Sequence, residues 1–266
     1  MNHLLRSLAP ISDEVWKFLD EEARQRATVA LAARRLVDFS GPYGWQHSAT
    51  NLGRTDVVGS PPVEGVSVRQ RVVLPLVELR AAFSISLAEL QDFDRGARDI
   101  DVRELDKAAH QVAVAENTVV FNGWQGTVRG MGQASPYPPA HLGGTVNEYP
   151  SRVAAAVGLL RENGVGGPYG LALGPEQHRV VLETAEHGGY PLFEHLAKIV
   201  DGPIVWAPGL RGAAIVSLRG GDFLFESGQD LSIGYDSHDR EVVRFYLEES
   251  FSFRVTTPEA SALVQA

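Results

Sequence analysis

The 266-residue sequence predicts an α+β fold, and three stretches indicate it. Residues 243–255 alternate apolar and polar side chains, which is the pattern of a strand with one buried face. Residues 101–122 repeat apolar side chains at three- and four-residue steps, as a long helix does. Residues 149–218 alternate helical and strand-like segments, which predicts a small α/β domain inserted before the last long strands.

The predicted strand at residues 243–255 is unusually long. At about 3.3 Å per residue it would run roughly 43 Å, enough to cross a whole subunit. Glu249 is the one interruption of its apolar face, and we expect it to mark a bulge or a bend. Periodicity alone leaves open that this is a long strand in an ordinary sheet. The apolar face is formed by Val243, Phe245, Leu247, Phe251, Phe253 and Val255.

A first helix is predicted to begin at Ser12 or Asp13, either of which is a good N-cap residue. Its apolar positions form a single stripe at helical spacing, and Arg34 and Arg35 lie near its C-terminal end, where cations are favoured. The stripe is shallow because three of its members are alanines, and either the core or a docked peptide must fill it. These alanines are Ala23, Ala27 and Ala30.

Two extended arms at residues 50–58 and 66–73 flank a Gly- and Pro-rich turn at 59–65. Both arms are poor in apolar side chains for their length, and an isolated two-stranded ribbon is only marginally stable in water. The arms therefore form either a mobile flap or an arm stabilised by another subunit, and we favour the second. Residues 74–90 are mixed apolar and open a helical segment at 86–93, whereas residues 125–147 are predicted to be a loop.

Composition narrows the function classes. With 44% hydrophobic and 21% charged residues, the chain is typical of a folded protein, and its net charge of −9 argues against non-specific nucleic-acid binding. It contains no cysteine, which excludes disulfides and thiolate chemistry. We expect neither a signal peptide nor a membrane span, because the longest uncharged apolar run, at 153–160, is far below the ~20 residues required. The expected location is the cytoplasm.

No local motif for catalysis or for a metal is found. The sequence lacks a Gly-x-Ser-x-Gly elbow, a Walker loop and a His-Glu-x-x-His pair. His187 and His195 are close in sequence but have no third ligand at metal spacing. Asp236, His238 and Asp239 lie in a predicted turn that explains them without catalysis. The sequence therefore predicts no catalytic residue and no metal site, and points to a protein that works through its surfaces.

Several long stretches resemble the encapsulin shell proteins, the family also labelled linocin M18 or CFP29-like. They are LLRSLAPIS at 4–12, RRLVDFSGPYGW at 34–45, PLVELRAAFSIS at 75–86, RGGDF at 219–223 and GQDLSIGYDSHD at 228–239. The resemblance implies the fold of HK97-type phage capsid proteins, with a peripheral domain, an extended E-loop and an apical domain. It assigns residues 1–48 to the N-terminal helix and start of the peripheral domain, 49–73 to the E-loop, 74–148 to the peripheral domain with its spine helix, 149–218 to the apical domain and 219–266 to the return into the peripheral domain.

The function that this resemblance implies is self-assembly into an icosahedral compartment of 60 identical subunits (T=1) in the bacterial cytoplasm. Such shells enclose cargo enzymes, dye-decolorizing peroxidases or ferritin-like iron-storing proteins, through a short C-terminal peptide on each cargo. The implied docking residues are Ala27, Ala30, Leu31, Arg34, Asp38, Phe39, Leu231 and Ile233. Arg34 and Asp38 are expected to fix the backbone or the ends of the peptide. Leu31→Asp or Ile233→Asp is expected to abolish cargo capture and leave assembly intact.

The same resemblance implies a pore loop and no cofactor. The loop comprises Ala185, Glu186, His187, Gly188, Gly189 and Tyr190. Relatives that bind flavin stack it between a tryptophan and a tyrosine; Tyr190 matches the tyrosine, but Ala88 stands at the tryptophan position, so we expect weak or no flavin binding. Two alternatives stay open: a secreted bacteriocin or protease-like enzyme, and a phage major capsid protein, which the negative net charge disfavours.

Overall fold

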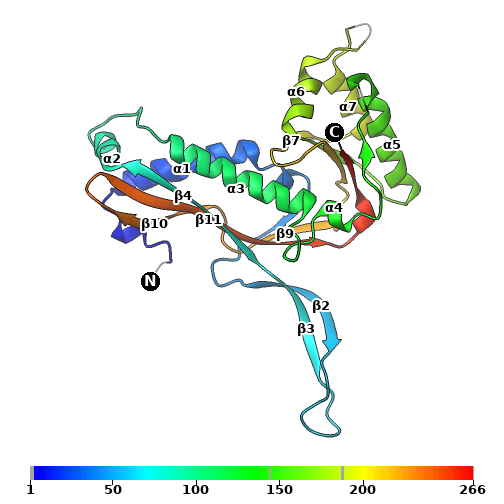
Figure 1. Ribbon diagram of the computed structural model, residues 1–266, viewed down its shortest axis with the longest axis horizontal. Coiled ribbons are helices and arrows are strands. Elements are labelled where there is room, and N and C mark those ends of the chain that lie inside the picture. The colour runs from blue at the N-terminus through cyan, green and yellow to red at the C-terminus, as the bar shows by residue number, and fades with distance from the viewer. Residues whose placement is uncertain (1–2, 144, 187–188, 266) are drawn as a thin grey trace.

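The chain forms two five-stranded sheets covered by helices, and a two-stranded hairpin that projects far from both (Figure 1). The computed structural model describes residues 3–143, 145–186 and 189–265. Helices and strands are mixed within one chain, which confirms the predicted α+β class.

The first sheet is built around the long strand predicted from the sequence, β11 (Val242–Val255). Strand β4 (Val77–Ser86) runs antiparallel along one edge of β11. Along the other edge, β10 (Ser232–His238) pairs with the first half of β11 and β9 (Phe223–Ser227) with its end. Strand β1 (Asp38–Ser40) completes the sheet, parallel to β9.

The expectation of a bulge at Glu249 is wrong. Strand β11 stays in register with β4 through this position, and the register shift lies in β10, between Tyr235 and Ser237. Strand β11 is also buried on both faces in its middle, because Glu248, Ser250 and Ser252 on the second face are covered. Part of this cover is polar: the Nε2 atom of His3 lies 2.8 Å from Oε1 of Glu248.

Three helices pack on the first sheet: α1 (Asp13–Ala30), α2 (Leu87–Asp94) and α3 (Arg103–Asn122). Ser12 caps α1 as predicted, since its hydroxyl oxygen accepts a hydrogen bond from the backbone N–H of Val15 at 3.2 Å. Figure 1 shows α1 and α3 lying over β4 and β11. The strand β4 itself was missed, although Val77, Leu79, Ala81, Phe83 and Ile85 alternate with a mostly polar second face, because the sequence prediction treats residues 74–90 as one mixed apolar stretch.

The second sheet has the order β5 (Ala140–His141), β12 (Ser261–Gln265), β8 (Ala213–Ser217), β6 (Tyr169–Leu173) and β7 (Ile204–Trp206). It packs with α5 (Tyr149–Glu162), α6 (Pro175–Glu183) and α7 (Leu192–Val200), of which α7 was not predicted.

Strand β12 pairs with β8, so the chain end does not stay in the first sheet as the range 219–266 implied. The predicted loop at 125–147 contains β5, the short helix α4 (Met131–Ala134) and a 3₁₀ turn, η3 (Val146–Glu148). Three further 3₁₀ turns are η1 (Arg6–Leu8), η2 (Ala33–Arg35) and η4 (Pro258–Ala260).

Helix α3 and strand β11 run through two separate apolar cores. Their first halves belong to a core with α1, β4 and β10, and their second halves to the core of the second sheet. On each element one buried glutamate lies at the boundary, Glu116 on α3 and Glu249 on β11. The polar interruption that stands out in the sequence of β11 therefore marks the seam between two cores.

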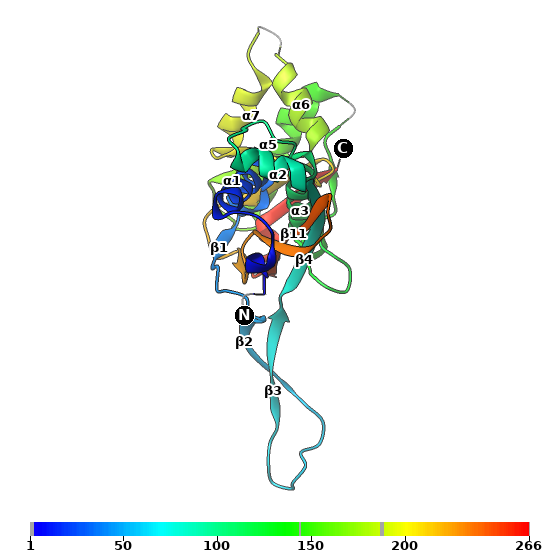
Figure 2. The same cartoon turned by 90° about the vertical axis from the view of Figure 1, so that its left-hand side faces the viewer.

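The hairpin consists of β2 (Ala49–Val57) and β3 (Arg69–Pro75), and both views show it extending beyond the body of the chain (Figures 1 and 2). Among the described residues, none of 49–75 belongs to either apolar core. The prediction that its arms are poor in apolar side chains needs correction. Six valines of the hairpin are between 36% and 75% exposed: Val57, Val58, Val63, Val66, Val68 and Val73.

Candidate functional site

A groove of about 380 Å³ runs between α1 and β10. Along α1 its wall is shallow, because Ala23 and Ala27 stand one turn apart and carry only methyl groups. Ile233 of β10 and Leu231, which directly precedes this strand, form the facing wall. The groove is therefore apolar in its middle and bounded by one helix and one strand.

The dimensions of the groove suit a short peptide segment. From Asp20 to Leu31 the helix advances about 17 Å at 1.5 Å per residue. An extended chain covers that distance in roughly five residues at about 3.3 Å each. An apolar groove of this size binds apolar side chains of a ligand through burial and leaves specificity to polar groups at its rim.

An ion pair closes one end of the groove. The guanidinium of Arg6 binds the carboxylate of Asp20 with both Nη atoms, at 2.6 and 2.7 Å. Its Nε–H donates to the carbonyl of Ile233 at 2.8 Å. The backbone N–H of Tyr235 donates to the carbonyl of Leu4. The N-terminal segment thus covers part of the β10 edge, and a ligand has to use the side-chain groove there instead of extending the sheet.

Arg34 closes the other end and holds three carboxylates at once. Its guanidinium nitrogens lie 2.7 Å from Glu116 Oε2, 2.6 Å from Asp230 Oδ1 and 2.5 Å from Glu249 Oε2. The aromatic rings of Phe39 and Phe225 lie 5.3 and 5.0 Å from its guanidinium carbon. Each of the three guanidinium nitrogens donates to one carboxylate of this network, so Arg34 has a structural task at the seam between the cores.

Burial shapes the protonation of this cluster. It raises the pKa of Glu249 well above its usual range, and the neighbouring Glu116 raises it further, against the opposing effect of Arg34. Burial also raises the pKa of Glu116, which Arg34 opposes. Burial lowers the pKa of Arg34, but the three carboxylates outweigh this and the net shift is upward. Both glutamates are therefore easier to protonate than a free glutamate, and Glu249 more so than Glu116.

The structure brings together five of the eight residues that the resemblance assigned to the groove: Ala27, Leu31, Arg34, Leu231 and Ile233. Ala30 faces away from it, is 1% exposed, and accepts a hydrogen bond from Asn117 of α3 through its carbonyl. Phe39 stacks on Phe225 outside the groove. Arg34 lines the groove as expected, and each of its guanidinium nitrogens already pairs with a carboxylate of its own chain.

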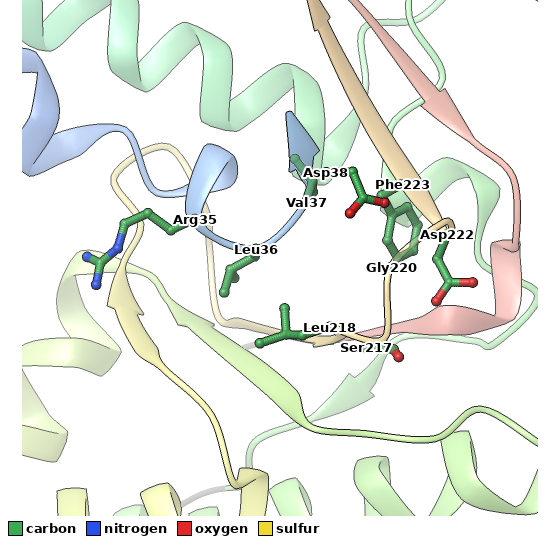
Figure 3. Close-up of a pocket in the computed structure, with 9 residues that line it drawn as sticks. All are labelled: Arg35, Leu36, Val37, Asp38, Ser217, Leu218, Gly220, Asp222 and Phe223. Atoms are coloured by element: carbon green, nitrogen blue, oxygen red, sulfur yellow. The ribbon is translucent and has the colours of Figure 1, made fainter. Parts of the chain in front are cut away.

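Asp38 lies in a different cavity, of about 200 Å³, where the chain passes between the two sheets (Figure 3). Its Oδ2 atom accepts a hydrogen bond from the backbone N–H of Gly221 at 2.6 Å. Gly220 and Phe223 line the same cavity. Asp38 thus fixes the link into β9 and does not meet a ligand in the α1–β10 groove.

Sequence reasoning missed several groove residues. Asp20 and Ala23 share the helical stripe of Ala27 and were within reach of the periodicity argument. Arg6 and Leu247 were not, because the contact of Arg6 with Ile233 spans 227 positions of the chain. The missed lining residues include Arg6, Asp20, Asp230 and Leu247, whereas Ala23 already belonged to the predicted alanine stripe.

The predicted pore loop is described only in part, because His187 and Gly188 lie outside the described residues. Ala185 and Pro191 form an isolated antiparallel bridge that closes the base of the loop. Glu186 Oε2 lies 2.9 Å from Nδ1 of His195 on α7. The Nζ atom of Lys198 lies 5.0 Å from the ring centre of Tyr190. Helix α7 thus anchors both sides of the loop.

Neither a metal cluster nor a membrane span emerges from the part of the chain that the structure describes. No group of three or more His, Asp or Glu side chains in that part could hold a metal ion. None of the helices there is long and apolar enough to cross a bilayer. The groove itself is lined by apolar side chains together with Arg24, Thr28 and Ser232, and has internally paired charges at both ends.

A long helix over a sheet, a second sheet at one end and a projecting hairpin define a capsid-type subunit. Solved structures agree. The virus-like particle from Pyrococcus furiosus superposes with a TM-score of 0.69 at 18% identity, covering 95% of this chain and all of the other. The capsid of an empty GTA particle gives 0.55 at 15% identity, covering 89% and 90%. The fold is therefore that of the HK97-like capsid proteins.

Sequence comparison identifies the family within this class. A family model, Linocin_M18, described as an encapsulating protein for peroxidase, matches residues 1–252. The type 1 encapsulin shell protein of Rhodospirillum rubrum is 43% identical over 98% of this chain and 95% of the relative. That of Mycobacterium tuberculosis is 39% identical over 98% of both chains. This chain belongs to the encapsulin shell protein family, as its sequence motifs predicted.

Proposed function

We propose that this chain assembles into a closed icosahedral shell of about 60 copies in a T=1 arrangement. The shell lies in the cytoplasm and encloses a cargo enzyme, a peroxidase or a ferritin-like protein, held by its C-terminal peptide. The chain itself is structural and not an enzyme. The observation that carries the proposal is the hairpin, whose base is held by Thr50 through Glu226 and Ser252 and whose arms extend from the body with six exposed valines.

An exposed apolar ribbon is unfavourable for a monomer. Burying one valine fully contributes about 1.5 kcal/mol or more, and six such side chains are exposed along this hairpin. A two-stranded ribbon is also marginally stable when isolated in water. Contact with neighbouring copies stabilises both the ribbon and its valines, and the capsid-like fold supplies the symmetry in which every copy makes the same contact.

The α1–β10 groove is the proposed docking site for the cargo peptide. Its alanines and leucines offer apolar surface, and its length matches about five extended residues. Because Arg34 and Arg6 are paired within the subunit, affinity comes from apolar anchors of the peptide and not from a salt bridge to either arginine.

The loop at 185–190 is the proposed lining of an opening for ions and small substrates. Glu186 supplies a carboxylate near its base, held by His195. Carboxylates at a constriction favour passage of cations over anions. An enclosed iron-storing or peroxidase cargo needs such access.

Multi-angle light scattering and negative-stain microscopy of the purified chain test assembly. We expect uniform hollow particles of megadalton mass, because closed symmetry joins many copies of the subunit. A 28.8-kDa monomer at micromolar concentration would contradict the proposal. Absorbance at 260 nm separates it from a phage capsid, whose particles carry nucleic acid.

Leu231→Asp should reduce cargo capture at least about tenfold while particles still form, because a charge in the groove opposes burial of an apolar anchor. Leu31→Asp should act in the same way. Each shell variant is co-expressed with a dye-decolorizing peroxidase or a ferritin-like enzyme, with the last residues of the cargo present or removed. Cargo per shell subunit is then measured by quantitative mass spectrometry.

Val29→Asp is the matched control, since Val29 is 69% exposed on α1 and does not line the groove. It should leave cargo loading unchanged. Ile233 is unsuitable as a test position, because it is 1% exposed and aspartate there would disturb the first core. Full loading of Leu231→Asp particles would show that the cargo binds elsewhere.

A further inference from the structure

Three arginines meet at a cavity of about 280 Å³ at the foot of the hairpin. Arg54 comes from β2, Arg129 from the segment after α3, and Arg254 from the end of β11. These elements are far apart in the sequence. In a chain of net charge −9, such a concentration of positive charge is a distinct feature of the surface.

These arginines differ from most others of the chain in their pairing. Among the described residues, none of the three forms an ion pair, and the residues that line the cavity include no aspartate or glutamate. Arg34, by contrast, binds three carboxylates of its own chain. A guanidinium group can bind a carboxylate with two parallel N–H donors, so this cavity is suited to an acidic side chain of another molecule.

The local backbone shapes the cavity. Strand β2 shifts register against β3 between Asn51 and Arg54, and Gly53 adopts φ +67° at the shift. Such irregularities re-aim side chains at the edge of a sheet. The facing wall is a tight turn, in which the backbone groups of Trp124 and Val128 bond to one another at 2.8 and 2.9 Å. Arg129 follows this turn directly.

The distal end of the hairpin carries the complementary chemistry. Glu64 is the only charged residue between Val57 and Val68. It lies between Val63 and Val66, which are 61% and 50% exposed. The arginine cavity offers matching apolar surface beside its charges, from Leu52, Leu74 and Phe253.

We propose that the arginine cavity of one copy receives Glu64 and its flanking valines from a second copy. Within one subunit the two sites cannot meet in this conformation, since about ten residues of extended arm separate Arg54 from Glu64, roughly 30 Å. The contact joins two different surfaces, so repeated around a symmetry axis it closes a ring. This inference rests on the proposed shell and names one contact that holds the shell together.

Thiol cross-linking tests the contact, and the absence of native cysteine makes it specific. The double variant Glu64→Cys/Arg129→Cys is assembled and treated with a short bismaleimide. A linker is needed because an arginine–glutamate pair separates the Cα atoms more than the ~4.4–6.8 Å of a disulfide. We expect a ladder of covalent trimers and larger species on denaturing gels.

The controls are each single variant and the pair Glu64→Cys/Arg240→Cys. None of them should give covalent species larger than a dimer. A single cysteine per subunit can link only two copies, and Arg240 does not line the cavity, so its cysteine lies outside the proposed contact. Wild-type-sized particles with no ladder beyond these controls overturn the contact but leave the shell intact. A wild-type chain that forms no particles overturns the shell itself.

Charge exchange gives a second, independent readout. Arg129→Glu and Glu64→Arg should each lower the yield of particles about tenfold or more, and the double exchange should restore it, because the pair is re-formed between copies. If Arg129→Glu leaves the yield unchanged but lowers the absorbance of the particles at 260 nm, the cavity binds nucleic acid and the proposed contact is wrong.

Discussion

Replacing Arg34 with methionine should destabilise the subunit by about 3–5 kcal/mol, because it removes the positive charge that pairs with two buried glutamates. Glu116 and Glu249 are 0% and 2% exposed, so water cannot solvate their carboxylates in place of the lost guanidinium. Scanning fluorimetry of purified particles should show the loss as a fall of roughly 10 °C in Tm. A fall of less than 2 °C, about what ~0.5 kcal/mol produces, would show that the cluster is not a structural element of the seam.

The raised pKa of Glu249 predicts which second substitution should restore stability to the Arg34→Met variant. Its pKa is raised in the folded state, mainly by burial and then by Glu116, so the folded chain holds a proton that the unfolded chain releases above about pH 4.5. Stability contributed by this proton is present at low pH and declines as pH rises toward the raised pKa. Glu249→Gln cannot lose a proton, so its Tm should vary less with pH than that of the wild type. Arg34→Met/Glu249→Gln should recover part of the lost stability.

The same cluster shows how far sequence reasoning reaches. The break in the alternation of β11 at Glu249 was visible, but its cause was not, since the partners of Glu249 come from positions 34 and 116. A periodic pattern identifies the strand because its information is local. The seam between two cores depends on long-range packing, which no window of the sequence contains.

The groove and the hairpin show the same limit. The alanine stripe of α1 indicated a shallow surface, and the resemblance located its partner strand. Neither indicated that Arg34 is occupied internally or that Asp38 turns to Gly221. For the hairpin, the sequence predicted two arms poor in apolar side chains, and only the structure showed that six valines along it are left exposed in the subunit.

The largest effect is expected from shortening this hairpin. Arg54 and Val72 are paired across β2 and β3, so Asn-Gly can replace residues 55–71 as a two-residue turn. The variant should fold, because the removed residues belong to neither core, but it should remain a subunit-sized species in sedimentation velocity. The physical reason is that the removed valines are exposed in the subunit and, in the proposed shell, are covered by a neighbouring copy.

Substitution separates the shape of the arm from its apolar surface. One variant combines Val57→Thr, Val63→Thr and Val66→Thr. These substitutions keep the β-branched shape and the strand preference while adding hydroxyl groups. This variant should assemble only at higher protein concentration than the wild type, because each contact buries less apolar surface. Val29→Thr on α1 carries the same change at a site distant from the hairpin and should assemble normally. If the shortened chain still builds particles of wild-type size, the second sheet and the body of the subunit must supply the contacts that we assign to the hairpin.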